Sequence, residues 1–129
     1  MVYKFCQLID KILNKEIANK YLDLVSLGLI ADMMDLRDFE TKYLVNCGLS
    51  NITNPFLKGM IEKNAYSLGN DITPIGIAFY VAPYVNATIR MGGLEEKEIM
   101  FKSMLEYEAY NKIPSTKRGC KGQEEYVVE

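Results

Sequence analysis

The apolar run from Tyr21 to Leu36 most constrains how this chain can fold. It reads Tyr-Leu-Asp-Leu-Val-Ser-Leu-Gly-Leu-Ile-Ala-Asp-Met-Met-Asp-Leu, so apolar side chains would cover nearly every side of a helix. Periodicity alone does not separate a buried helix from a buried strand, but the length and the leucine-rich composition favour a helix over residues 17–32. Burying an ionised carboxylate is costly without a compensating donor or metal. We therefore expect Asp32 to face a cleft from the rim of a core, and Asp23 to lie on the solvent side.

The rest of the chain predicts a mostly α fold, an irregular bundle of about five or six helices. Asn54-Pro55 and Thr73-Pro74 each combine a capping side chain with a proline for the first helical turn, which is a typical helix start. We expect Asp35 to cap another helix, with Gly48 ending it. Apolar residues at helical spacing place the helices over residues 2–13, 17–32, 35–48, 54–69, 73–82 and 95–107.

Composition and the polarity of the last residues predict how the chain is organised. Hydrophobic residues make up 49% and charged residues 25% of the chain, a balance typical of a folded domain. Residues 1–110 are expected to form the helical part. Residues 111–129 are polar without an apolar period and are expected to form a tail or linker. The first helix begins without a lead-in, which indicates a piece of something longer.

Charge, cysteine content and apolar length exclude several classes of protein. The net charge of −2 argues against a strongly basic nucleic-acid surface, but it leaves room for a local phosphate site. The three cysteines lack metal-ligand spacing, and the N-terminus lacks a secretory segment, so we expect reduced thiols and a cytoplasmic location. The apolar run is too short and too interrupted to span a membrane.

A second segment carries residues suited to phosphate binding. It has the spacing Pro83-x-x-Asn86-Ala87-x-x-Arg90-x-Gly92. Arginine offers a planar fork of donors, asparagine offers an amide, and glycine permits close backbone approach, so a loop or helix end built this way can grip a phosphate. The purely structural alternative is that Arg90 pairs with Glu95 or Glu96 and that Asn86 satisfies its own turn.

Two further interpretations stay open. Asp32 could be a metal ligand, or it could cap the next helix or simply lie exposed. Tyr80 and Tyr84 flank Pro83 and could stack on unpaired bases or pack in the core.

The two segments together resemble part of the RecJ-like single-strand-specific exonucleases, which belong to the DHH phosphoesterase family. The stretch Leu22-Asp-Leu-Val-Ser-Leu-Gly-Leu-Ile-Ala-Asp-Met is similar to the fourth motif of that family, and Val2-Tyr-Lys-Phe-Cys-Gln is similar to the helix that follows its Asp-His-His motif. The likeness extends to about Lys121, nearly the whole chain. The chain departs from the family pattern at Tyr84, where the family has arginine, and at Ile89, where it has glycine.

The resemblance implies the C-terminal portion of an α/β DHH domain whose Asp-x-Asp and Asp-His-His motifs would precede Met1. The chain has no histidine and cannot hold the Asp-His-His motif itself. The complete enzyme would hydrolyse single-stranded DNA with Mn²⁺ or Mg²⁺ and serve DNA repair and recombination. In it, Asp32 would be a metal ligand, and Asn86, Arg90 and Gly92 would bind DNA phosphate.

Alone, the chain lacks a complete catalytic site, and we expect it to bind no metal and to be inactive. Two alternatives remain. One is a helical module that binds a partner or itself as a homo-oligomer through Leu24, Leu27, Ile30 and Met34. The other is a piece of another DHH phosphoesterase that acts on short oligonucleotides.

Overall fold

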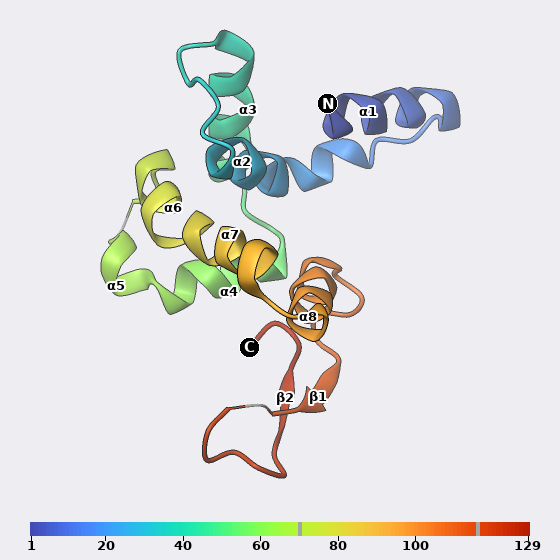
Figure 1. Ribbon diagram of the computed structural model, residues 1–129. Helices are drawn as coiled ribbons and strands as arrows, with labels where there is room; N and C mark the ends of the chain where they lie inside the picture. Colours follow the sequence, from blue (N-terminus) through green and yellow to red (C-terminus); the bar gives the residue numbers. More distant parts are fainter. Residues whose placement is uncertain (70, 116) are drawn as a thin grey trace.

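The computed structural model describes residues 1–69, 71–115 and 117–129 and confirms a mostly helical fold (Figure 1). Two short strands near the C-terminus form an antiparallel hairpin. No helix in the described part of the chain is both long and apolar enough to cross a membrane. In chain order the elements are α1 (Val2–Leu13), the 3-10 helix η1 (Ala18–Tyr21), α2 (Leu22–Ala31), α3 (Phe39–Ser50), α4 (Pro55–Lys63), α5 (Ala65–Leu68), α6 (Pro74–Tyr80), α7 (Ala82–Met91), α8 (Leu94–Met104), β1 (Lys112–Pro114) and β2 (Glu124–Tyr126).

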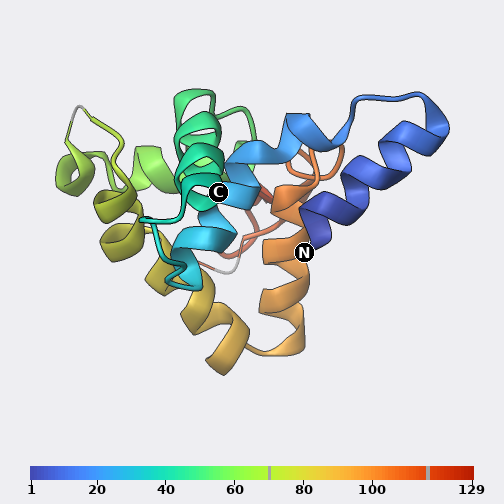
Figure 2. The same ribbon diagram turned by 90° about the horizontal axis from the view of Figure 1, so that it is seen from above.

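The hydrophobic core lies between α2, α3, α4, α6 and α7. Leu57 and Ile77 are fully buried there, and Met100 and Met104 of α8 pack against its edge. Viewed from above, α1 projects away from this core (Figure 2). The buried apolar side chains are Leu27, Ile30, Val45, Phe56, Leu57, Ile77, Val81 and Val85.

Two helix starts confirm the signals expected from the sequence. The Asn54 side-chain oxygen accepts a hydrogen bond from the Phe56 amide at 3.0 Å. The Thr73 hydroxyl accepts one from the Gly76 amide at 3.1 Å. The Asn54 side-chain amide also donates to the Met104 carbonyl at 2.9 Å, so the same cap ties α4 to the end of α8.

The start of α3 corrects the expected cap. Asp38 is the capping residue, because its carboxylate accepts the Thr41 amide at 2.9 Å, and this hydrogen bond holds the pKa of Asp38 below its ordinary value. Asp35 instead pairs with Arg37 at 2.9 Å, and the guanidinium holds the pKa of Asp35 below its ordinary value. Both aspartates are residues that can cap a helix, and the structure uses Asp38 as the cap and Asp35 as the partner of Arg37.

The end of α3 also differs from the expectation. Gly48 does not end the helix, which continues to Ser50. Gly48 is buried against α2, where an added side-chain carbon would collide with the Leu22 carbonyl and the Ser26 hydroxyl. Its small size therefore serves helix packing and not termination.

Asp23 is buried, so the expectation that it faces solvent is wrong. Only 1% of the Asp23 surface is exposed. One carboxylate oxygen accepts the amides of Thr53 and Asn54 at 2.9 and 2.7 Å, and the other accepts the Leu24 amide at 2.8 Å. The turn before α4 thus supplies the donors that compensate the buried charge.

The segment expected to be a polar tail or linker contains the β1–β2 hairpin. Lys112 lies opposite Tyr126 in the hairpin. After β2, the amide of Val128 donates to the carbonyl of Ala109 at 3.0 Å, and Val127 is buried. Two adjacent valines in a polar stretch give no apolar period, so the pattern did not reveal this packing.

An apolar face of α1 is exposed, and only part of the patch expected from the sequence is. Leu27 and Ile30 of α2 are core residues, Leu24 is half-buried, and Met34 after the helix is exposed, so these four residues do not form one exposed patch. No residue of α1 is buried. The exposed side chains on its apolar face are Val2, Phe5, Leu8, Ile9, Ile12 and Leu13.

Candidate functional site

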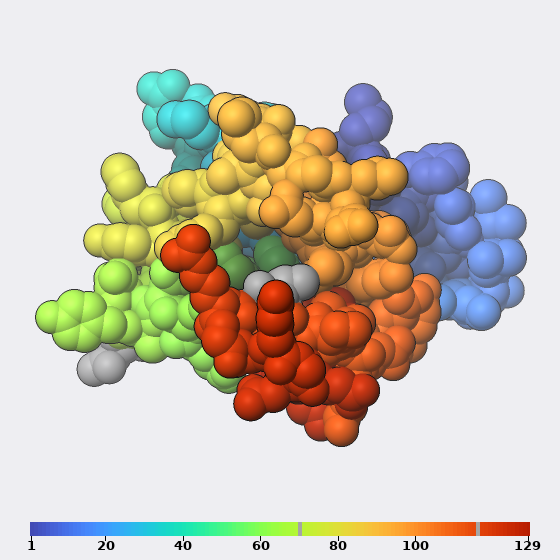
Figure 3. All heavy atoms as spheres, turned by 60° about the horizontal axis from the view of Figure 1, so that its bottom comes forward, coloured from blue at the N-terminus to red at the C-terminus, as the bar shows by residue number. Residues whose placement is uncertain are grey.

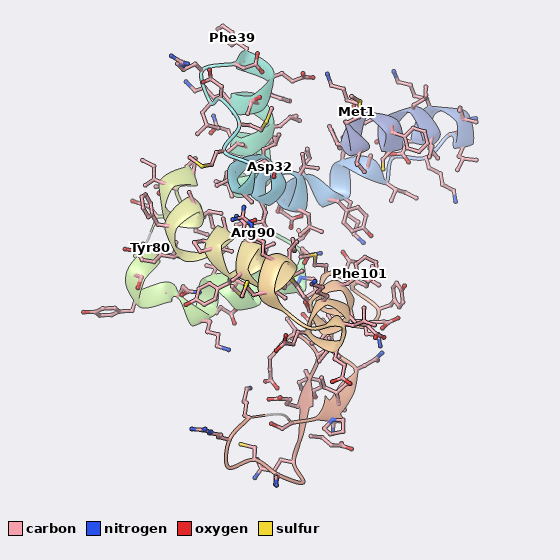
Figure 4. The ribbon with its side chains drawn as sticks, viewed as in Figure 1. Met1, Asp32, Phe39, Tyr80, Arg90 and Phe101 are labelled. Carbon is pink, nitrogen blue, oxygen red and sulfur yellow. The ribbon has the colours of Figure 1, made fainter. Side chains whose placement is uncertain are left out.

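Asn86 and Arg90 lie on helix α7, one turn apart. Residues four apart share a face of a helix, so the two side chains are neighbours. Asn86 is half-buried, and Arg90 is exposed in the last turn. The Arg90 side chain extends from α7 toward α2, the helix against which α7 packs (Figure 4). The segment that was expected to be a loop or a helix end is the helix α7, which carries both donors on one side, with Arg90 in its last turn.

Among the described residues, neither Asn86 nor Arg90 has a hydrogen-bond or ion-pair partner for its side chain. The pairing of Arg90 with Glu96 is not formed, because the Glu96 carboxylate accepts the Gly93 amide at 2.6 Å within the start of α8. A free guanidinium beside a free amide is a donor arrangement that suits a phosphate oxygen.

Asp32 follows the last residue of α2 and is exposed. It lies at a groove of about 550 Å³ between α1 and α2, and it is the one carboxylate among the described residues that line this groove. The cap of the following helix is Asp38, so Asp32 does not serve as one. Its side chain has no hydrogen-bond partner in the described part of the chain.

A single carboxylate does not make a metal site. Mg²⁺ and Mn²⁺ are held by several oxygen ligands in a fixed geometry. Within residues 1–69, 71–115 and 117–129, no group of three or more histidine, cysteine, aspartate or glutamate side chains could hold a metal ion. The residues present therefore do not fit a complete metal centre, and Asp32 could offer one ligand at most.

Gly92 and the tyrosines lie apart from this face. Gly92 follows Met91, the last residue of α7, and an added side-chain carbon there would collide with the carbonyl oxygen of Thr88. Gly92 and Tyr84 both line a cavity of about 600 Å³ between α4, α7 and α8, a cavity that Arg90 does not line. Tyr80 is partly exposed at the end of α6. The structure therefore brings Asn86 and Arg90 together and leaves the other candidates elsewhere.

Asp23 is the residue whose role sequence reasoning missed. The sequence predicts a solvent-exposed Asp23, whereas its buried carboxylate accepts the amides of Thr53 and Asn54 and links α2 to the turn before α4. Its position inside an apolar run was the available signal. The apolar pattern around Asp23 could not predict its hydrogen-bond donors, because Thr53 and Asn54 lie in a different part of the sequence.

Comparison with known proteins shows that this chain is similar to part of a protein from Bacillus subtilis (strain 168) named "Putative SPbeta prophage-derived single-strand DNA-specific exonuclease YorK". The two are 44% identical over 119 residues, which is 92% of this chain and 20% of that protein. The same identity and coverage relate it to the "Putative single-strand DNA-specific exonuclease yorK" of Bacillus phage SPbeta. This chain thus spans about a fifth of the length of these relatives.

No family model matches the chain, and no solved structure matches it significantly. The matched region includes 92% of this chain, so the similarity is not confined to a short motif.

Proposed function

We propose that this chain is the helical portion of a RecJ-like, metal-dependent exonuclease domain that acts on single-stranded DNA. Asn86 and Arg90 bind a backbone phosphate from one face of α7. Gly92 follows the last residue of that helix, in the lining of the neighbouring cavity between α4, α7 and α8. Asp32 contributes one carboxylate to a Mn²⁺ or Mg²⁺ site whose remaining ligands come from other parts of such a nuclease.

The observation that carries this proposal is the 44% identity with the two exonuclease-named relatives over 92% of the chain. The geometry supports it, because Asn86 and Arg90 lie one turn apart on α7 and the Arg90 side chain extends toward α2, the helix that Asp32 follows (Figure 4). The proposal assigns the chain a DNA-positioning role and not a complete catalytic one.

Replacing Arg90 with alanine is expected to weaken the binding of this chain to single-stranded DNA about tenfold, since a charge-assisted contact to phosphate is lost. Fluorescence anisotropy with a labelled oligothymidylate at low salt measures the dissociation constant. Lys42→Ala removes the same charge from an exposed position on α3 and is the control. An equal loss in both variants, or none in Arg90→Ala, contradicts the proposal.

With Mn²⁺ added, the oligonucleotide should stay intact, because one carboxylate cannot assemble a hydrolytic centre.

A second candidate function, self-association, is favoured by the exposed face of α1. Phe5, Leu8 and Ile12 are 61%, 54% and 72% exposed. A specific interface needs to bury about 1,000 Å² in total, so a symmetric pair would have to use most of this apolar face. We propose that two copies pack through α1, since two-fold dimers are the commonest closed assembly.

Sedimentation at concentrations near 50 µM should therefore show a dimer, because ~micromolar dissociation constants are typical of interfaces of this size. The double variant Phe5→Gln, Leu8→Gln should be a monomer, because the interface loses its apolar centre. Lys11→Gln, on the polar face of the same helix, should leave the dimer intact. A monomeric wild-type chain would refute self-association through α1.

A further inference from the structure

A groove lies between α4 and the β1–β2 hairpin, in a part of the molecule that no residue of the candidate site occupies. It has a volume of about 640 Å³, and we call it the α4–hairpin groove. Figure 3 shows the C-terminal residues lying against α4. In Figure 1 the hairpin lies at the bottom of the view and α2 in its upper half. Figure 4, in the same view, labels Asp32 at α2. The side chains that give it its character are Lys58, Lys63, Lys117, Tyr110 and Tyr126.

Backbone hydrogen bonds fix the C-terminal wall of the groove, and Val128 brings that wall against α4. The Val128 amide donates to the Ala109 carbonyl, and the Val127 amide donates to the Asn111 carbonyl, both at 3.0 Å. Val128 also packs on α4, where a carbon added to Gly59 would lie 3.3 Å from its methyl group. The groove is therefore formed by the fold itself, because the strand after the hairpin loop docks on the helix.

Two tyrosine rings line one side. Tyr110 and Tyr126 pack edge to face, with ring centroids 6.4 Å apart and an angle of 77° between the ring planes. They are nevertheless 61% and 42% exposed. Exposed aromatic rings fixed by a neighbour are platforms on which unpaired bases can stack.

Several cationic side chains lie near these rings. Lys58 and Lys63 are exposed, and neither has an ion-pair partner among the described residues. Lys117 pairs with Glu125 at 2.6 Å, which raises the pKa of the lysine and keeps it charged. Arg118 and Lys121 lie exposed in the hairpin loop.

Two acids also line the groove. Glu129 is held by the Tyr126 amide at 3.1 Å, while Glu62 lies on α4 between the two free lysines in sequence. Three lysines and these two acids line the groove, and Glu125 pairs with Lys117, so the cations without an ion-pair partner among the described residues are Lys58 and Lys63 in the lining and Arg118 and Lys121 in the loop beyond it. This combination of cations and rings favours an anionic strand with unstacked bases over an acidic peptide, which has no bases to use the rings.

We propose that the α4–hairpin groove binds single-stranded nucleic acid, with Lys58 and Lys63 on the phosphates and Tyr110 and Tyr126 stacking on bases. This inference rests on the proposed function, since it adds a second contact for the same strand. The strand would be held at two separated places, by α7 and by the groove, which lengthens the site and directs the strand across the molecule.

The test measures binding of a labelled oligothymidylate of about 20 nucleotides, long enough for several contacts of the site sizes known for single-strand binders. Lys58→Ala with Lys63→Ala is expected to weaken binding about tenfold and to reduce the salt slope by about 1.4, because two phosphate contacts are lost. Tyr126→Leu should weaken binding about fivefold or more through lost stacking. Lys11→Ala with Lys42→Ala removes the same charge from α1 and α3 and should change affinity less than about twofold.

The outcomes separate the groove from the proposed function. If Arg90→Ala weakens binding and the groove variants do not, the groove proposal fails while the α7 contact stands. If the groove variants weaken binding and Arg90→Ala does not, the groove stands and the α7 phosphate contact fails. Equal affinity for a duplex of the same length, with no effect of Tyr126→Leu, overturns the single-strand assignment. Unchanged thermal unfolding of each variant shows that its loss of affinity is not a loss of fold.

Discussion

Replacing Asp23 with alanine is expected to lower the free energy of unfolding by about 3 to 4 kcal/mol, because it leaves two or more backbone donors without their acceptor. The amides of Thr53 and Asn54 would lose the carboxylate that they contact at 2.9 and 2.7 Å. Asn54 is itself 1% exposed, so water cannot easily replace the acceptor. Urea denaturation followed by circular dichroism gives the free energy, and the loss should come as a lower midpoint at an unchanged slope.

The matched control is Asp32→Ala, which removes an aspartate just beyond the other end of the same helix. Asp32 is exposed and its side chain contacts no polar partner in the described part of the chain, so its loss should change stability by less than about 0.5 kcal/mol. Similar losses in the two variants would refute the account of Asp23. The pair therefore separates the aspartate that holds the fold from the one proposed to serve function.

Local signals were enough to predict where several helices start. Asn54-Pro55 and Thr73-Pro74 carry both the cap and the fixed backbone angle within four residues, so no distant contact is needed. The same reasoning selected the wrong capping residue for α3, Asp35 in place of Asp38. Both aspartates satisfy the local rule, and the Arg37 salt bridge that engages Asp35 is not encoded in capping preferences.

Features that depend on partners distant in sequence could not be predicted. The buried state of Asp23 requires the turn at Thr53, 30 residues later. The hairpin depends on Val128 reaching Ala109 and α4, and two valines in a polar stretch have no period. The expected exposed patch on α2 failed because α3 and α7 cover Leu27 and Ile30 in the core.

The candidate site was partly predictable for the same reason. Asn86 and Arg90 are four residues apart, so they share a face once the segment is helical. Asp32 was expected to face a cleft from the rim of the core, and it lies beside the groove between α1 and α2. The α4–hairpin groove was outside the reach of this reasoning. Lys58 and Tyr126 meet only because the chain returns to α4 after 60 further residues or more.

Replacing Gly48 with alanine is expected to lower the free energy of unfolding by about 2 to 4 kcal/mol, although alanine is the better helix former by about 1 kcal/mol. The new methyl group would collide with the Leu22 carbonyl and the Ser26 hydroxyl. Ser26 cannot rotate away cheaply, because its buried hydroxyl lies 2.9 Å from the Leu22 carbonyl and 3.1 Å from the Leu44 carbonyl. Relief therefore requires α2 and α3 to separate.

Gly28→Ala is the matched control and should act in the opposite direction. Gly28 lies in α2 with no atom within 4 Å of an added side-chain carbon, so only the helix propensity changes. The variant should raise the free energy of unfolding by about 0.5 to 1 kcal/mol. Thermal or urea unfolding of both variants decides the point. If Gly48→Ala also stabilises the protein, α2 and α3 do not approach as closely as the structure places them. If Gly48→Ala alone destabilises it, the small residue at this crossing keeps Ser26 and Asp23 of α2 within reach of α3 and of the turn before α4.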